Sequence, residues 1–117
     1  MPSPPTDARI VVLASGSGSL LQALIDACAA GAVDASIVAV GSDVHGAPAL
    51  DRARAAGIPA FACPVGDFTS RAEWDAALLA EVRGRTPDWV VSAGFMRILG
   101  GDFVEAFPGR IINTHPA

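Results

Sequence analysis

The chain has 117 residues, of which 51% are apolar, so it is long enough for one domain with a real core and too short for two. Its net charge of −4 comes from 12 acidic against 8 basic residues, every base is arginine, and no basic run suits a nucleic-acid partner. The apolar runs are only as long as strands, which excludes a membrane span, and the proline-rich start has no secretory core. We therefore expect a cytoplasmic domain over residues 9–117 that follows a disordered tail over residues 1–8.

The two cysteines, Cys28 and Cys63, lie far apart in apolar surroundings, with no CxxC spacing and no companion histidine. Buried free thiols fit this pattern better than a disulfide bridge or a metal site. The sequence therefore indicates no metal.

Strand and helix patterns alternate along the chain. Gly31 and Gly57 end the first two predicted helices, and Pro59 places the third predicted strand near an edge of the sheet. This alternation predicts right-handed crossovers and an α/β fold with a doubly wound, mostly parallel, Rossmann-like sheet. The predicted strands are 9–14, 36–40, 58–63, 89–92 and 110–113, and the predicted helices are 19–30, 48–56, 71–83 and a short one over 102–107.

Two of the predicted helices have clear periodic patterns. In the first, Leu20 belongs to the apolar stripe that the spacing assigns to the buried side. The third begins with a capping box, Ser70 followed by Glu73, and its buried side should carry Trp74, Leu78 and Val82.

Three loops follow the first, fourth and fifth predicted strands, with the sequences SGSGS, AGFMRIL and NTHPA. Doubly wound sheets bind ligands beyond the carboxyl ends of their strands, near the point where the strand order reverses. The three loops are therefore candidates for one shared site.

The SGSGS loop lies directly between a strand and a helix, where successive backbone amides can bind an anion at the positive end of the helix. It is neither a GxGxxG fingerprint nor a GxxxxGK[ST] loop. In the alternative interpretation, Gly16 and Gly18 only make a tight turn. The candidate phosphate-binding residues of this loop are Gly16, Ser17, Gly18 and Ser19.

The segment 94–99 has two interpretations. Its backbone could face a flat heterocycle while Phe95, Ile98 and Leu99 wall a slot, as in mostly apolar ligand pockets with few polar groups. Alternatively, the segment is core with one solvated arginine, Arg97, and the pattern alone favours this second interpretation.

Asn113 and His115 are two residues apart, so an extended backbone points both side chains to the same side. An imidazole can transfer a proton near neutral pH and an amide can donate to an oxyanion, which suits attack on a carbonyl carbon. No serine or cysteine nucleophile adjoins them, so direct transfer between two substrates is favoured over a covalent intermediate. A histidine at a strand end is often only structural, and His45 is most simply a surface residue.

Arg71 lies in the first turn of the third predicted helix, where a cation gains nothing from the helix dipole. A ligand carboxylate could explain this position, and so could a solvated arginine without a role.

The segments VVLASGSGSLLQALIDA, SR followed by an aromatic residue, AGFMRIL and GRIINTHPA together resemble the amino-terminal half of the phosphoribosylglycinamide formyltransferase family. The resemblance covers nearly the whole chain from Arg9 onward. It implies a metal-free transfer of a formyl group from 10-formyltetrahydrofolate to the amine of glycinamide ribonucleotide, in a protein that can form homodimers.

The resemblance also implies roles for single residues. Through the glycine loop, Gly18, Ser19 and Leu20 would bind the ribonucleotide phosphate. Arg71 would contact folate, Asn113 would hold the formyl oxygen, and His115 would act as general acid. The residues that would line the pterin slot, largely through backbone groups, are Met96, Arg97, Ile98 and Leu99.

Two departures from the family pattern bear on these roles. The family often has asparagine where Ser17 and Leu20 stand, and its aspartate that raises the pKa of the catalytic histidine would lie beyond Ala117. We therefore expect the 117-residue polypeptide alone to be inactive. The rival interpretations are a related enzyme that uses formyltetrahydrofolate, such as a hydrolase or another formyltransferase, and a non-catalytic module that binds a phosphorylated ligand.

Overall fold

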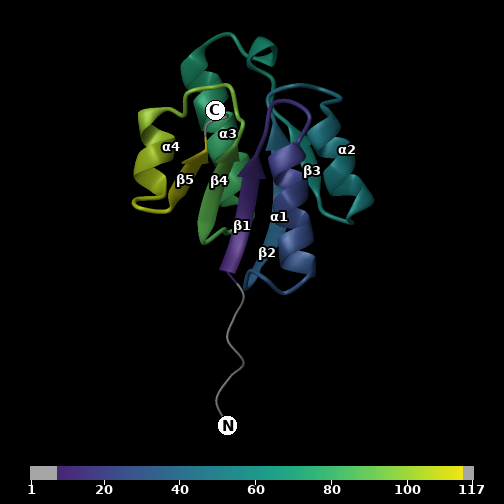
Figure 1. Ribbon diagram of the computed structural model, residues 1–117. Coiled ribbons are helices and arrows are strands. Elements are labelled where there is room, and N and C mark those ends of the chain that lie inside the picture. Colours follow the sequence, from purple (N-terminus) through teal and green to yellow (C-terminus); the bar gives the residue numbers. More distant parts are fainter. Residues whose placement is uncertain (1–7, 115–117) are drawn as a thin grey trace.

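The computed structural model describes residues 8–114 and contains one parallel sheet with the strand order β3-β2-β1-β4-β5 (Figure 1). The predicted doubly wound α/β fold is confirmed, and β3 lies at an edge, as Pro59 predicted. The disordered-tail prediction over 1–7 lies outside the described residues. The elements are β1 (Ala8–Leu13), α1 (Ser19–Ala29), β2 (Ala35–Ser42), α2 (Pro48–Ala55), β3 (Ala60–Ala62), the 3-10 turn η1 (Val65–Asp67), α3 (Arg71–Arg83), β4 (Trp89–Ala93), α4 (Gly101–Ala106) and β5 (Ile111–Thr114).

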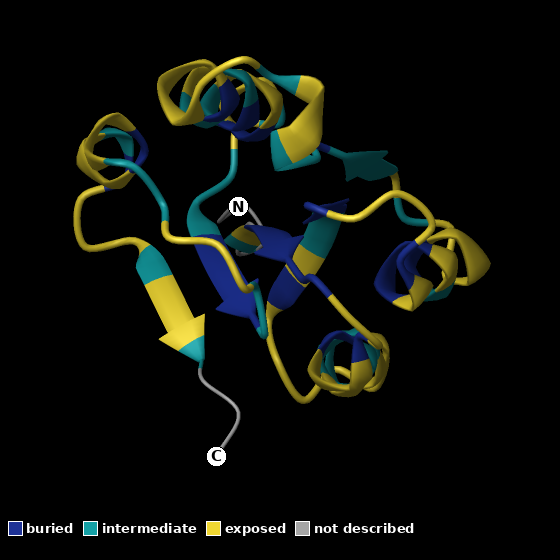
Figure 2. Ribbon diagram, turned by 90° about the horizontal axis from the view of Figure 1, so that it is seen from above, coloured by how far each residue is buried: buried dark blue, intermediate teal, exposed yellow. Residues whose placement is uncertain are grey.

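Helices cover both faces of the sheet, and each face has its own apolar core. The helices α1 and α2 pack on one face, and α3 and α4 pack on the other (Figure 2). Because successive side chains of a strand alternate, β1 sends Ile10 and Val12 to the first core and Val11 and Leu13 to the second. A central parallel strand is buried on both faces, which explains why its sequence is continuously apolar.

Several strand boundaries differ from the prediction. The strand β1 begins at Ala8, which we had assigned to the tail, and the Ala8 amide donates to the Asp34 carbonyl at 3.3 Å. The strand β2 continues to Ser42 because its end pairs with β3. The strand β3 is shorter than predicted because Ile58 does not pair in the sheet: its amide donates to the carbonyl of Ala53 near the end of α2.

The helix α1 buries a narrower face than its apolar pattern predicted. Leu21 is fully buried, whereas Leu20 is exposed at the end of the helix that follows the glycine loop, so its assignment to the buried stripe was wrong. In a helix of 3.6 residues per turn, consecutive leucines point about 100° apart, so only one of the two can face the sheet squarely.

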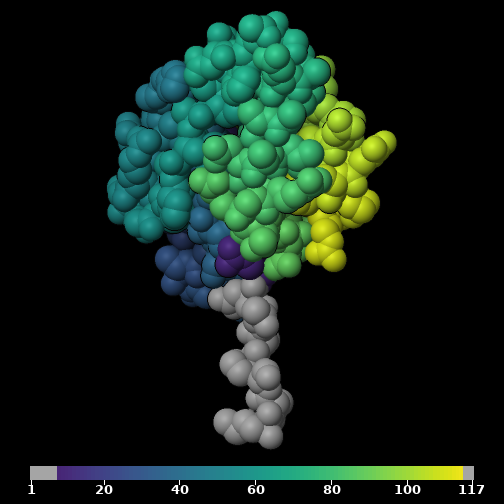
Figure 3. Space-filling view, turned by 180° about the vertical axis from the view of Figure 1, so that it is seen from behind, coloured from purple at the N-terminus to yellow at the C-terminus, as the bar shows by residue number. Residues whose placement is uncertain are grey.

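The helix α3 begins and packs as predicted. The Glu73 amide donates to Ser70 Oγ at 3.1 Å, and Trp74, Leu78 and Val82 are buried against the sheet. The Glu73 carboxylate accepts from Thr69 instead of the Ser70 amide, so the capping box is a variant of the usual one. Figure 3 shows α3 across the rear face, beside α4 and β5.

No helix in the described part of the chain is long and apolar enough to cross a membrane.

Candidate functional site

The loops that follow β1 and β4 meet the end of β5 at one end of the sheet (Figure 1), while the predicted loop after β5 lies outside the described residues. The strands β1 and β4 are neighbours, and the strand order reverses between them. Such a reversal leaves a crevice beyond the carboxyl ends of the two strands. We had expected one shared site, but the structure has two pockets. They lie on opposite sides of the ends of β4 and β5.

Pocket 1 has a volume of about 400 Å³ and contains the glycine loop. The first-turn amides of α1 have no partner within the helix and are available at the positive end of its dipole. All five predicted phosphate-binding residues line it. The lining consists of Gly16, Ser17, Gly18, Ser19, Leu20, Ala93, Gly94 and Thr114.

The glycine loop rests on α2 through its carbonyl groups. The Ala49 amide donates to the Gly16 carbonyl at 3.2 Å, and Arg52 Nε donates to the Ser17 carbonyl at 2.7 Å. In a trans peptide the carbonyl and the next amide point in opposite directions, so the amides of Ser17 and Gly18 point away from α2. The arginine also places a positive charge behind the loop, which favours an anion in pocket 1.

Gly18 is required where it stands. Its φ of 77° lies in the left-handed region, and a Cβ atom there would lie 2.8 Å from the backbone Cα of Ala49. By contrast, Gly16 has open space around it and no positive φ. The close approach of α1 to α2 therefore depends on Gly18.

Pocket 2 has a volume of about 420 Å³ and contains the segment after β4. Met96 is 75% exposed and Ile98 is 84% exposed, so the interpretation of this segment as core is wrong for both residues. Phe95 and Leu99 do pack against the core. The lining consists of Ser92, Phe95, Met96, Arg97, Ile98, Leu99, Val104, Ile111 and Asn113, which includes every residue predicted for the slot.

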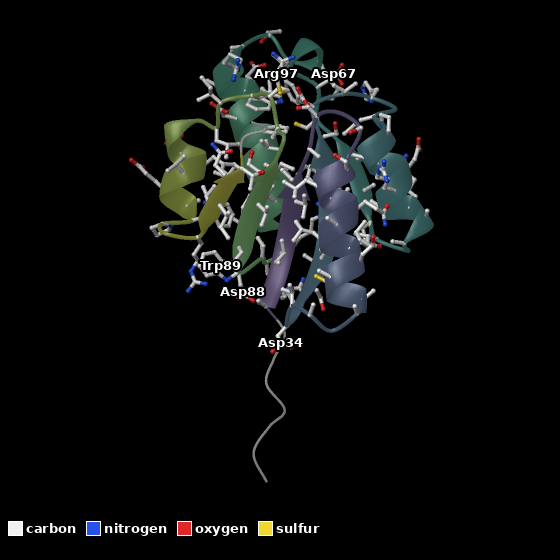
Figure 4. All side chains as sticks on the ribbon, viewed as in Figure 1. Asp34, Asp67, Asp88, Trp89 and Arg97 are labelled. Atoms are coloured by element: carbon white, nitrogen blue, oxygen red, sulfur yellow. The ribbon has the colours of Figure 1, made fainter. Side chains whose placement is uncertain are left out.

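Arg97 is not a freely solvated arginine. Its Nε lies 2.8 Å from Oδ2 of Asp43, which is buried directly after β2. Figure 4 shows Arg97 at the end of the molecule where the strands have their carboxyl ends, opposite Asp34, Asp88 and Trp89. The segment after β4 is therefore tied across the sheet to the end of β2.

Arg71 contacts the same segment from α3. Its Nη2 donates to the Ile98 carbonyl at 3.2 Å, and its guanidinium lies 4.9 Å from the ring centroid of Trp74. The Trp74 ring also stacks with the ring of Phe95, with 6.2 Å between the two ring centroids. These contacts account for the position of Arg71 in the first turn of α3, and no bound ligand is needed to explain it. Arg71 lies beside the residues that line pocket 2 and is not among them.

Consecutive residues at the end of β5 face different pockets. Asn113 lines pocket 2, while Thr114 lines pocket 1 and donates from Oγ1 to the Ser92 carbonyl at 2.9 Å. Strand alternation requires this division. His115, the predicted general acid, lies outside the described residues. The end of β5 is thus the boundary between the two pockets.

Two groups near the site have shifted pKa values. Burial, with smaller contributions from Glu81 and Asp67, raises the pKa of the Cys63 thiol to about 11, so this thiol is neutral at physiological pH. Hydrogen bonds from the Thr69 hydroxyl and amide lower the pKa of Glu73 at the start of α3. His45 is on the surface, as predicted, with Nε2 at 3.2 Å from Asp67.

The sequence analysis missed residues that hold the loops from outside. These are Asp43, Arg52 and Asp75, and Asp75 accepts from the Gly100 amide at 3.2 Å. Asp43 could have been noticed, because it is an acidic residue directly after a strand that ends near the site. The other two lie in the middle of helices, where no local pattern separates them from solvated charges.

The formyl transferase family model matches residues 8–117. The chain belongs to the formyl transferase family. It is 51% identical over 114 residues to phosphoribosylglycinamide formyltransferase of Mycobacterium tuberculosis, which covers 97% of this chain and 52% of the relative. The Escherichia coli enzyme of the same name is 46% identical over 109 residues, covering 93% of this chain and 51% of the relative.

The fold likeness is equally clear. The crystal structure of glycinamide ribonucleotide transformylase 1 from Symbiobacterium toebii has a TM-score of 0.91 and 41% identity, covering 97% of this chain and 53% of that one. The resemblance drawn from the sequence motifs is therefore confirmed. The chain spans about half the length of the curated relatives it matches.

Proposed function

We propose that this chain forms the substrate-binding half of a folate-dependent formyltransferase, which transfers a formyl group from 10-formyltetrahydrofolate to glycinamide ribonucleotide. The observation that carries the proposal is the pair of pockets that meet at the end of β5, one lined by Thr114 and the other by Asn113. A direct transfer needs two substrates held side by side with an activating group between them. The names of the relatives support the choice of substrates.

In the proposal, pocket 1 receives the ribonucleotide. The amides of the glycine loop and of the first turn of α1 bind the phosphate, and Arg52 adds positive potential from behind. Leu20 and Ser17 replace the asparagines that the family often has there. The binding therefore depends on backbone amides more than on side chains.

Pocket 2 receives the pterin. The exposed side chains of Met96 and Ile98 offer apolar surface, and the backbone of the same segment offers hydrogen bonds to a flat heterocycle. Arg71 has further guanidinium donors beside Ile98 for a folate carboxylate.

The reaction is an acyl transfer. The ribonucleotide amine attacks the formyl carbon, the carbonyl oxygen becomes an oxyanion, and the bond from this carbon to N10 of the folate breaks. The Asn113 amide donates to the oxyanion, His115 gives a proton to N10, and the attacking nitrogen loses a proton to solvent water. The products are formylglycinamide ribonucleotide and tetrahydrofolate. No metal takes part.

The test is formyl transfer by the polypeptide of natural length, which intact mass determines beforehand. We expect Asn113→Ala to lower kcat about a hundred-fold to a thousand-fold, because one oxyanion donor is lost. We expect His115→Ala to lower kcat by about a hundred-fold or more, because proton transfer to N10 is lost. His45→Ala is the matched control and should leave kcat unchanged, since His45 lies on the surface at Asp67.

Each contrary result has a definite meaning. If His115→Ala transfers formyl as fast as the unchanged protein, the catalytic assignment of His115 is wrong. If the unchanged protein binds the ribonucleotide but transfers no formyl group, a non-catalytic binding module is favoured. Release of formate without transfer would favour a hydrolase. The cytoplasmic location and the homodimer that the resemblance implies stay predictions.

A further inference from the structure

Asp43 is a buried acidic residue that forms an ion pair with Arg97, a residue of pocket 2. Its side chain is 2% exposed and its Oδ2 lies 2.8 Å from Nε of Arg97, whose side chain is 41% exposed. The second carboxylate oxygen, Oδ1, has no hydrogen-bond partner among the described residues. The pair joins the carboxyl end of β2 to the segment after β4 and so spans the intervening strand β1.

Stability of the fold does not explain this arrangement. Removing a carboxylate from water is costly, and a buried ion pair repays the cost only when the remaining oxygens also have partners. Within residues 8–114, only one of the two Asp43 carboxylate oxygens has a hydrogen-bond partner. Replacing such a pair with apolar groups is often neutral or stabilising. The residue is better explained by the geometry that it imposes on Arg97.

The segment 94–100 needs such a constraint at its centre. Met96 and Ile98 flank Arg97, and both side chains are exposed, so apolar packing cannot hold this part of the segment. Polar contacts hold the backbone on both sides of Arg97: the Met96 amide donates to Ser15 Oγ at 2.8 Å, the Ile98 carbonyl accepts from Arg71, and the Gly100 amide donates to Asp75. Between them, Arg97 is the position whose side chain reaches another strand.

We propose that Asp43 is a positioning residue for pocket 2, which holds the segment 94–100 through Arg97 in the shape that receives the pterin of folate. This inference rests on the proposed function for the ligand, but its structural part does not. The carboxylate does not line pocket 2 and acts only through Arg97. The relation predicts that the local order of the segment and the affinity for folate change together.

Amide hydrogen exchange at Met96 and Gly100 tests the structural part. Both amides are bonded to side chains, so their exchange reports the opening of the segment. We expect Asp43→Ala to speed both about tenfold or more, because a charge-assisted hydrogen bond is lost. Asp43→Asn keeps an acceptor for Arg97 and should restore most of the protection. The matched control is Asp51→Ala, which removes the carboxylate of the exposed pair with Arg54 at 3.7 Å and should change neither amide.

The ligand part is measured on the same variants, with 10-formyltetrahydrofolate and glycinamide ribonucleotide as separate probes in calorimetry. We expect Asp43→Ala to weaken folate binding about tenfold, in proportion to the lost order, while ribonucleotide binding in pocket 1 is unchanged. Asp43→Asn should bind folate nearly as well as the unchanged protein, because it keeps an acceptor for Arg97.

Three results would overturn the inference or separate it from the proposed function. Equal exchange at Met96 and Gly100 in the unchanged protein and in every Asp43 variant that folds would overturn it. A uniform rise in exchange over all amides, with a lower Tm, would also overturn it, because Asp43 would then serve the fold alone. Faster exchange confined to 94–100 in a protein that binds no folate would keep the positioning role and refute the proposed function.

Discussion

At the scale of single residues, the site depends on a few backbone positions that only one residue type can occupy. Gly18 combines a positive φ with close contact to α2, while Gly16, two residues earlier, has neither constraint. The two glycines look identical in the SGSGS motif. The pair therefore offers a direct comparison within one loop.

We predict that Gly18→Ala lowers the free energy of unfolding by at least about 2 kcal/mol, because the left-handed backbone is strained and the new methyl meets Ala49. For Gly16→Ala, we expect the loss in the free energy of unfolding to be smaller than for Gly18→Ala by about 1 kcal/mol or more, down to nearly no loss. Urea unfolding of the two variants measures both values. Equal losses in the two variants would contradict the special constraint at Gly18.

The buried thiol of Cys63 predicts how stability changes at alkaline pH. Burial raises its pKa from 9.0 to about 11, so the folded state holds this proton more tightly than the unfolded state. The stability from the neutral thiol is therefore complete below about pH 9 and is lost as the pH rises through 11.

We expect the free energy of unfolding of the unchanged protein to fall relative to Cys63→Ala as the pH rises between these two values. Parallel curves for the two proteins over this window would contradict the shift. The comparison isolates one thiol, because the other titrating groups are common to both proteins.

At the scale of elements, α3 supports the site from the rear face of the sheet. Its first turn places Arg71 against Ile98, and the next residue on this face, Trp74, stacks with Phe95 and donates from Nε1 to the Cys63 carbonyl at 2.7 Å. The starting residue of α3 is thus coupled to the shape of pocket 2. The Ser70 cap fixes that start.

We predict that Ser70→Ala lowers the free energy of unfolding by about 1 kcal/mol, because the Glu73 amide loses its acceptor. Ser70→Thr keeps the side-chain oxygen and serves as the control, with a loss of a few tenths of a kcal/mol. Thermal and urea unfolding measure the difference. A full-size loss in the threonine variant would mean that shape, and not the hydrogen bond, matters at this position.

At the scale of the whole molecule, the sheet has unequal edges. Among the described strands, β5 pairs only with β4, and it lies at the margin of the molecule (Figure 2). Its residue Ile112 is 47% exposed. The opposite edge, β3, is only three residues long. A longer edge with an exposed aliphatic residue is the better template for pairing with another chain.

We therefore predict that a polypeptide of these 117 residues self-associates as its concentration rises, and that Ile112→Lys reduces the association, since an edge lysine opposes strand pairing. Val33→Lys is the matched control, because Val33 is 39% exposed but lies in the turn between α1 and β2. Sedimentation velocity measures the effect. An equal reduction in both variants would show that added charge, and not the edge, is responsible.

Sequence reasoning reached most of the fold because the relevant signals are local. The alternation of apolar strands with amphipathic helices, the glycines at helix ends and the Ser70 cap all depend on residues within a few positions of each other. The strand boundaries were less well predicted, since the end of β2 depends on pairing with β3 across the sheet.

For the site, the sequence alone determined which strand ends meet, because parallel strands place their carboxyl ends at the same edge of the sheet. Only the tertiary structure decided that the loops form two pockets, that Arg97 is bound to Asp43, and that Arg71 supports Ile98. The partners in these contacts are separated by tens of residues along the chain. Periodicity describes which way a side chain points on its own element, and the packing of one element on another determines what that side chain contacts.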